Sequence, residues 1–357
     1  MAEQQDSYSA RRFIFVAAAF VVILWGIYQA QSVVVLALVS VFIAVLGTVP
    51  VRWMEGKHVP PIIAVLIVMA AMVGLILSIG VVIGASLNNF SNALPFYQSR
   101  LHEMLFSLKA LLAARGIMVT DTVLIGYLDP AMVMNVTASL FSTLGSTLSN
   151  AVLVLFTVTF ILLEAASFPA KLRLVRETPR ASFPQFAKFI NEIKRYVVIK
   201  TLINLVAGVL VALWLWILGV DFPVLWGFLT FLLQFIPSVG SIVAAAPAVL
   251  LTLIQRGGGY AALAGAGYLV IGLILGNIVE PRIMGRKFGL STLVVFLSLI
   301  IWGTLLGVFG ALLCVPLTMT LKLACEENEE WRWVAVILGP VNQVERTTGA
   351  PKRKAGS

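Results

Sequence analysis

Long apolar runs separated by short polar turns dominate the pattern along the chain. Six of these runs predict membrane-spanning helices: 13–28, 33–49, 61–85, 140–163, 197–218 and 260–279. Most approach the roughly 20 residues that a helix needs to cross a hydrocarbon core. The polar residues 29–32 separate the first two runs, so we expect a tight hairpin of two spans there. Residues 50–60 form the polar turn before the third span.

The segment 87–139 has a different pattern. Apolar residues recur at helical spacing with charged residues between them, which predicts an amphipathic helix from near Pro95 to Gly116. The apolar positions are Leu94, Tyr97, Leu101, Leu105, Leu108 and Leu112, and the charged ones are Arg100, Glu103 and Lys109. This helix could lie on the membrane surface or pack against a neighbouring subunit, and the pattern leaves both open.

Two apolar runs are too long for one span, and each is broken near its middle. The run 225–254 would extend roughly 45 Å as a straight helix, beyond a hydrocarbon core of about 30 Å. Its break is at 236–240, and the run 290–323 is broken at 303–310. Proline follows each break, at Pro247 and at Pro316. We therefore interpret 197–254 and 260–323 as a weak repeat, each copy being a span followed by an interrupted pair.

Basic residues favour one topology over another. The segment 171–200 holds eight of them: Lys171, Arg173, Arg176, Arg180, Lys188, Lys194, Arg195 and Lys200. Cytoplasmic loops collect such residues, and they could additionally bind anionic lipid headgroups. If both interrupted runs are re-entrant hairpins, more of the 25 basic residues fall on the cytoplasmic side than if both cross. The two units would then be inverted relative to each other, as in alternating-access transporters.

The predicted organisation is therefore all-α and polytopic, with six full spans and two re-entrant or interrupted hairpins. Cytoplasmic tails occupy 1–12 and 324–357, three spans 13–86, and an extracytoplasmic amphipathic segment 87–139. A fourth span and a basic cytoplasmic segment occupy 140–196. The transport core would be 197–323.

Composition agrees with a membrane protein. Charged residues make up 11% of the chain and hydrophobic ones 60%, whereas soluble domains carry roughly 25% charged residues. The net charge of +9 is expected for a membrane protein whose cytoplasmic loops collect Lys and Arg. The sequence has no basic patch interleaved with aromatic residues, so nothing in it predicts binding of nucleic acid. Cys314 and Cys325 lie too far apart in one helical run to form a disulfide within it.

Polar groups inside membrane spans are functional candidates because they are costly there. Asn277 and Glu280 lie three residues apart, which predicts one helix face, and Pro281 then ends the helix. Glu280 could carry a proton for coupled transport, or it could pair with Arg282 or Arg286; both interpretations remain open.

The broken tips are the other candidates. Non-helical backbone at membrane depth is tolerated only where protein buries it or water lines it, so the tips indicate a substrate path or a packed joint. The residues that could line such a path are Gln234, Pro237, Ser238, Gly240, Ser241, Gly303, Thr304, Gly307 and Gly310. Ser and Thr in membrane helices more often bond their own backbone or a neighbouring helix.

Enzyme chemistry has little support in the sequence. The two histidines, His58 and His102, lie in polar segments, and no metal-ligand spacing or nucleophile elbow is present. The glycines 257–259 follow no strand and are followed by no lysine, so they do not predict a phosphate-binding loop. We expect no catalytic activity, no cofactor and no metal.

The chain resembles the autoinducer-2 exporter-like transporters, also known as PerM/UPF-type permeases, over most of 11–325. Four features carry the resemblance: the early span pair, the turn 235–240 with Pro247, the stretch 277–285, and the segment 303–316. The resemblance implies an oligomeric transporter in the cytoplasmic membrane of a bacterium or archaeon. Members are linked to export of a small signalling molecule, and some to sodium–proton exchange.

Three functions are therefore open. The first is a secondary transporter that exports a small solute. The second is a cation–proton antiporter with Glu280 as the coupling group. The third is a non-transporting membrane scaffold that binds partners through 87–139, although a scaffold would have little reason to keep two interrupted helices.

Overall fold

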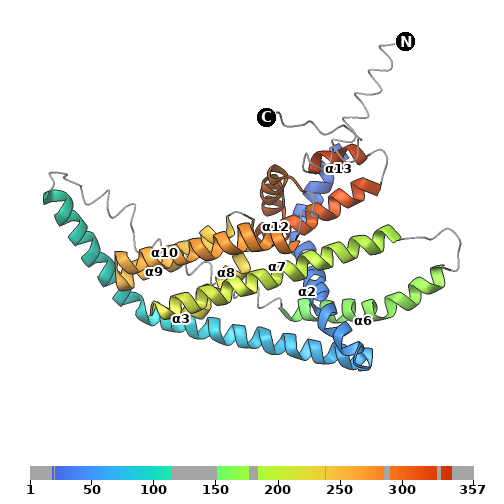
Figure 1. Ribbon diagram of the computed structural model, residues 1–357, viewed down its shortest axis with the longest axis horizontal. Helices are drawn as coiled ribbons and strands as arrows, with labels where there is room; N and C mark the ends of the chain where they lie inside the picture. The colour runs from blue at the N-terminus through green and yellow to red at the C-terminus, as the bar shows by residue number, and fades with distance from the viewer. Residues whose placement is uncertain are drawn as a thin grey trace, which may run out of the picture. The chain divides into compact units, whose positions relative to one another are not determined.

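The apolar runs become helices in the computed structural model, which describes residues 18–19, 21–114, 151–176, 184–237, 239–284, 290–327 and 331–339. Within these ranges every regular element is a helix (Figure 1). They are α2 (Gln31–Glu55), α3 (Pro61–Ala114), α6 (Ala151–Arg176), α7 (Pro184–Ile217), α8 (Pro223–Leu233), α9 (Gly240–Arg256), α10 (Gly258–Gly272), the π-helix η1 (Leu273–Val279), α11 (Glu280–Met284), α12 (Thr292–Glu327) and α13 (Arg332–Leu338).

Five helices in the described part of the chain are long and apolar enough to cross a membrane. They are Gln31–Glu55, Pro61–Phe90, Asn191–Ile217, Gly258–Ile283 and Thr292–Glu326. Three shorter apolar helices, Ala151–Ala165, Pro223–Leu233 and Gly240–Arg256, accompany them. The prediction of an all-helical polytopic membrane protein is confirmed. The predicted start of the fourth span, 140–150, lies outside the described residues.

The predicted hairpin at 29–32 is replaced by a kink. Residues 21–29 are helical, Ala30 forms a turn, and helix resumes at Gln31. The Ala30 carbonyl accepts hydrogen bonds from the backbone N–H groups of Val33 and Val34. The Ala30 N–H in turn donates to the Gly26 carbonyl, so helical hydrogen bonds continue on both sides of the turn and the chain bends there. Gln29, Gln31 and Ser32 lower the hydropathy of this stretch without interrupting helical hydrogen bonding.

The third span and the amphipathic helix are one element, not two. The helix α3 contains 54 residues and continues through Pro95 to Ala114, a length of roughly 80 Å. Figure 1 shows it bending along its length. Proline ends or kinks a helix because it lacks an N–H donor, and here it does not end α3. The predicted boundary at Pro95 is therefore wrong.

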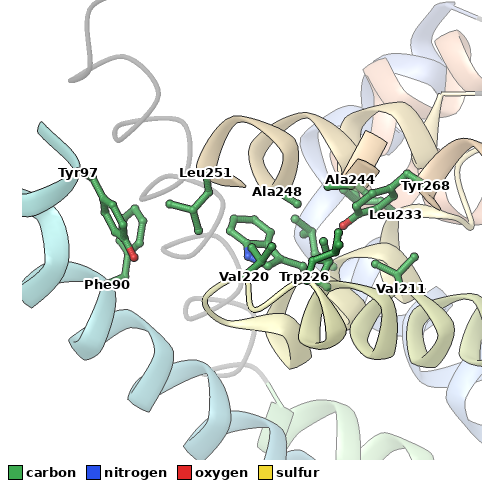
Figure 2. Packing of buried hydrophobic residues seen from close by; sticks show 14 residues of the cluster. Phe90, Tyr97, Val211, Val220, Trp226, Leu233, Ala244, Ala248, Leu251 and Tyr268 are labelled. Atoms are coloured by element: carbon green, nitrogen blue, oxygen red, sulfur yellow. The ribbon is translucent and has the colours of Figure 1, made fainter. Parts of the chain in front are cut away.

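The chain forms two compact units. One contains Val45–Phe288, and the other contains Met1–Ala44 together with Gly289–Ser357. The core of the first unit is a cluster of buried apolar side chains from α3, α7, α8, α9 and α10 (Figure 2). Gly208 on α7 and Gly227 on α8 allow two backbones to cross closely, because a Cβ at either would collide with the other's carbonyl oxygen. Small residues at helix crossings are typical of membrane proteins.

The first interrupted run folds back on itself as the α8/α9 hairpin. The Asp221 N–H donates to Gln255 Oε1 at 3.1 Å, and Arg256 donates to the Gly219 carbonyl at 2.8 Å. The start and the end of the hairpin therefore lie together, as the fold-back predicts and a straight crossing does not. At its turn, Gly240 lies so near the Leu233 carbonyl oxygen that a Cβ would overlap that atom.

The second interrupted run also folds back, within α12 and in the other unit. Thr318 donates to Ser298 Oγ at 2.8 Å, although 20 residues separate them; in a straight helix they would be about 30 Å apart. The reversal lies at Gly307, whose φ of 65° is positive and therefore favours glycine. Beyond 323 the helix continues to Glu327, and α13 packs on α12. The segment predicted as a tail is thus partly helical.

Candidate functional site

An ion pair between α7 and α11 is the main polar feature of the first unit. Lys200 Nζ donates to both carboxylate oxygens of Glu280, each at 2.8 Å. The side chains are only 7% and 23% exposed. Both residues lie within helices long enough to span a membrane. Charged groups in such positions are costly unless they are paired.

A π-helix sets the direction of Glu280. Regular α10 ends at Gly272, and the wider turns of η1 follow until Val279, directly before Glu280. Such segments are frequent at functional sites. The prediction that Asn277 and Glu280 share a face assumed a regular α-helix, and the π-helix changes that spacing: Asn277 is exposed, and Glu280 turns toward α7. Arg282 is exposed and Arg286 lies outside the described residues, so Lys200 takes the pairing role expected of an arginine.

Asn204 connects the ion pair to the turn of the α8/α9 hairpin. It is fully buried on α7, one turn after Lys200. With its amide oriented to satisfy both groups, Nδ2 donates to the Lys200 carbonyl at 3.3 Å and Oδ1 accepts from the Phe235 N–H at 3.2 Å. A buried amide therefore bonds both to the helix of the ion pair and to the broken backbone. A movement of the turn would change these contacts.

The other end of the hairpin holds a second polar group. Tyr97 on α3 donates to Asp221 Oδ2 at 2.6 Å, and Trp226 Nε1 donates to the Asp221 carbonyl at 3.0 Å. Burial and the neighbouring Asp221 carboxylate raise the pKa of Tyr97, so its hydroxyl remains a donor. Phe222, with a φ of 59°, completes the sharp entry into α8. This network anchors the base of the hairpin.

The predicted path residues of the first hairpin gather around its turn. Gln234 is buried at the end of α8, Pro237 is half-buried, and Gly240 begins α9. Ser238 lies outside the described residues. Ser241 on α9 lies beside Gly272 on α10. The turn is thus packed against neighbouring helices.

The predicted path residues of the second hairpin lie in the unit that contains α12. Gly307 makes the reversal, and Gly310 approaches the Trp302 carbonyl too closely for any Cβ. Gly303 has room for one, because its nearest neighbour would be Ala311 Cβ at 3.7 Å. Thr304 is exposed and donates to the Ile300 carbonyl of its own helix. A Cβ on Gly307 would be 3.2 Å from Gln31 Nε2, so the Gln31 amide lies beside this turn.

Sequence reasoning missed Lys200 and Asn204. Lys200 was interpreted as the end of a cytoplasmic basic stretch, and the polar Asn204 was not singled out. Both lie within the apolar run 197–218, so the rule that drew attention to Glu280 applied to them as well. Their partners lie 80 and 31 positions along the chain and could not be assigned from the pattern.

The groups of the described site are suited to binding a polar solute or an ion rather than to catalysing a covalent reaction. A neutral ion pair, an amide and a tightly turned backbone supply hydrogen bonds and one exchangeable carboxylate. Within the described ranges no group of three or more histidine, cysteine or acidic side chains could hold a metal ion.

Comparison with known proteins agrees with this geometry. The sequence matches the family described as AI-2E family transporter over residues 14–329. The chain belongs to the AI-2E transporter family. It is a multi-pass membrane transport protein, and the resemblance noted from its turns and spans is confirmed.

Relatives in this family match along nearly their whole length. The AI-2 transport protein TqsA of Escherichia coli (strain K12) is 37% identical over 343 residues, covering 96% of this chain and 100% of the relative. YhhT of the same strain, named as a transport protein without a substrate, is 33% identical over 349 residues, covering 98% and 100%. A similarly named Haemophilus influenzae protein is 32% identical over 344 residues, covering 94% and 99%.

Proposed function

We propose that this AI-2E family member is a secondary transporter that exports a small solute or signalling molecule. Its core would contain the two broken-helix units 197–254 and 260–323. It would act as a homo-oligomer in the cytoplasmic membrane of a bacterium or archaeon, with both termini cytoplasmic. The name of TqsA, an AI-2 transport protein, makes AI-2 the first solute to test.

The observation that carries this proposal is the Lys200–Glu280 pair beside a broken helix. A buried ion pair is often no more stabilising than apolar residues of similar size, so its presence within candidate spans is weak evidence for a purely structural role. Asn204, one turn after Lys200 on α7, bonds the Lys200 backbone carbonyl and the Phe235 N–H of the hairpin turn. A change at Glu280 that shifts α7 near Lys200 would therefore reach the turn.

The carboxylate of Glu280 favours cation–proton antiport as the second candidate. A cation that binds Glu280 must compete with Lys200 Nζ, which holds both carboxylate oxygens at 2.8 Å. A cation bound there would leave the buried Lys200 ammonium without its partner, which is costly. Cation binding and proton movement could then be linked at one place.

The test uses purified protein in proteoliposomes loaded with a pH-sensitive dye. AI-2 efflux and sodium-dependent proton flux are measured for the wild type, Glu280→Gln, Lys200→Gln and the double variant. Breaking one partner of a buried pair costs about 3–5 kcal/mol of folding free energy, so each single variant is expected to be destabilised. The double variant removes both charges and is expected to regain most of that stability.

The double variant decides whether the pair is functional. We expect it to fold and to lose flux of the solute or ion that the protein moves. Wild-type flux of AI-2 without sodium-dependent proton movement selects the exporter, and the reverse selects the antiporter. Full flux in a stably folded double variant would show that the pair is only structural. If the wild type shows neither AI-2 efflux nor sodium-dependent proton flux, the result favours the non-transporting scaffold.

A further inference from the structure

Tyr268 on α10 carries a buried hydroxyl that the described structure leaves without a hydrogen bond. The residue is 5% exposed, and its hydroxyl oxygen is the one buried side-chain polar atom among the described residues that has no partner. Figure 2 shows this oxygen pointing into the packed cluster. Burying a hydroxyl without a partner costs free energy. Such a group therefore needs an explanation.

The surroundings of Tyr268 consist of small side chains and one hydroxyl. On one side lie the small residues Ala244 and Ala248 of α9, both fully buried, and Gly272 follows Tyr268 by one turn on α10. Opposite is Thr230 of α8, which faces the Tyr268 hydroxyl outside hydrogen-bonding geometry and donates its own proton to the Trp226 carbonyl at 2.7 Å. The Thr230 oxygen thus keeps a lone pair free to accept a bond. A donor and an acceptor face the same seam.

We propose that Tyr268 and Thr230 form a binding subsite for the transported solute at the seam between α10 and the α8/α9 hairpin. When the hairpin separates from α10, the Tyr268 hydroxyl donates to an oxygen or nitrogen acceptor of the solute, and the Thr230 oxygen accepts from it. The solute class is small and polar, because the two groups supply one hydrogen-bond donor and one acceptor within an otherwise apolar cluster. This inference rests on the proposed transport function.

The position of the subsite supports its role. Along α10 and its continuation, Tyr268 precedes Glu280 by 12 residues, about 18 Å of helix. Along α8, Thr230 precedes Gln234 by one turn, on the side of the hairpin that leads to the turn bonded by Asn204. The helix that carries Tyr268 continues through η1 to Glu280, and α8 leads to the turn bonded by Asn204 of α7, so separation of the hairpin would affect both the seam and the surroundings of the ion pair.

Two buried tyrosines in one cluster give a matched experiment. Tyr97 is 1% exposed and bonded to Asp221, whereas Tyr268 is unpartnered. Tyr97→Phe removes a hydrogen bond and is expected to lower the melting temperature by about 2 °C. Tyr268→Phe removes none and is expected to leave the melting temperature unchanged or raised, while AI-2 efflux from proteoliposomes falls about tenfold or more, as expected for loss of one donor to a polar ligand.

The outcomes separate this inference from the proposed function. If the wild type exports AI-2 and Tyr268→Phe exports it equally well, the subsite is overturned while the proposed transport function stands. A melting temperature lowered as much as in Tyr97→Phe, with efflux retained, shows a structural bond to Thr230 and also overturns it. Absence of wild-type efflux defeats AI-2 as the solute, and a labelling experiment then decides the subsite without any solute.

That experiment places single cysteines in a background lacking Cys314 and Cys325. Tyr268→Cys is expected to react with a small hydrophilic methanethiosulfonate reagent, because the seam must open to water. Leu215→Cys, fully buried on α7 in the same cluster, is the control and is expected to stay unreactive. Equal protection at both positions would show a permanently dry core and would overturn the subsite.

Discussion

The α8/α9 hairpin is joined within itself at its base, between Asp221 and Gln255, and is otherwise held by groups on other helices, whereas the arms of the α12 hairpin are braced by their own side chains. Asn204 of α7 bonds the turn of the first, and Tyr97 of α3 bonds Asp221 at its base. In the second, Trp302 Nε1 donates to Thr318 Oγ1 at 3.1 Å, and Thr318 donates to Ser298 at 2.8 Å. These bonds join one arm of α12 directly to the other.

This difference predicts different mobility. A hairpin tied to its neighbours changes those contacts when it moves, so its position can depend on an ionisable pair such as Lys200–Glu280. A hairpin cross-linked within itself moves as one body or not at all. The first hairpin is therefore the better place to couple movement to charge, and the second is the better rigid support.

Both turns nevertheless share one steric requirement, which gives the largest expected effect. Gly240→Ala and Gly310→Ala each place a Cβ against a backbone carbonyl that cannot move independently. Each is expected to lower the free energy of unfolding by about 3 kcal/mol. Thermal unfolding followed by fluorescence-detected size exclusion measures this.

The matched controls for those variants are Gly272→Ala and Gly303→Ala. Their new Cβ atoms would meet neighbours at 3.8 Å and 3.7 Å, which is ordinary contact, and they should change stability little. If Gly240→Ala were as stable as Gly272→Ala, the close contact between Gly240 and the Leu233 carbonyl would be contradicted.

Internal bracing is tested by two buried threonines. Thr318→Val breaks the link between Trp302 and Ser298 and is expected to cost about 2 kcal/mol, because the indole donor loses its partner. Thr252→Val in α9 loses only a bond to the Ala248 carbonyl of its own helix, and about 0.5 kcal/mol or less is expected. Thermal unfolding in one detergent compares them; equal losses would remove the distinction between the hairpins.

The last comparison concerns the amides at the two turns. Asn204→Ala removes two hydrogen bonds from a fully buried position and is expected to cost about 1 kcal/mol per bond. Gln31→Ala, at a half-buried residue beside Gly307, is expected to cost about 0.5 kcal/mol or less because water can replace the amide. Hydrogen exchange at the turns provides the readout: faster exchange is expected at 234–237 in Asn204→Ala. A larger effect from Gln31→Ala than from Asn204→Ala would contradict the inference that the first turn depends more on an amide from another helix than the second does.

Local signals in the sequence were sufficient for several features. Glycine and proline mark the two breaks because they act on their own backbone, and both breaks are present as reversals at 234–239 and at Gly307. Glu280 was conspicuous because an ionisable residue within an apolar run stands out without any knowledge of its neighbours. The same local reasoning failed at Pro95 and at 29–32, where hydropathy and proline changed but helical hydrogen bonding continued.

By itself, then, the sequence determined the class of protein, its helical runs, the two broken segments and one carboxylate of the candidate site, because these depend on residues close together in the chain. Only the tertiary structure decided that Lys200 pairs with Glu280 and that the amides of Asn204 and Gln31 lie at the two turns. It also decided that the Tyr268 hydroxyl has no partner among the described residues. Those facts depend on helix crossings such as Gly208 with Gly227 and on the turns of η1, which set where a side chain points. Contacts between residues 80 positions apart follow from how helices pack, and the periodicity within one helix does not determine which helices pack against it.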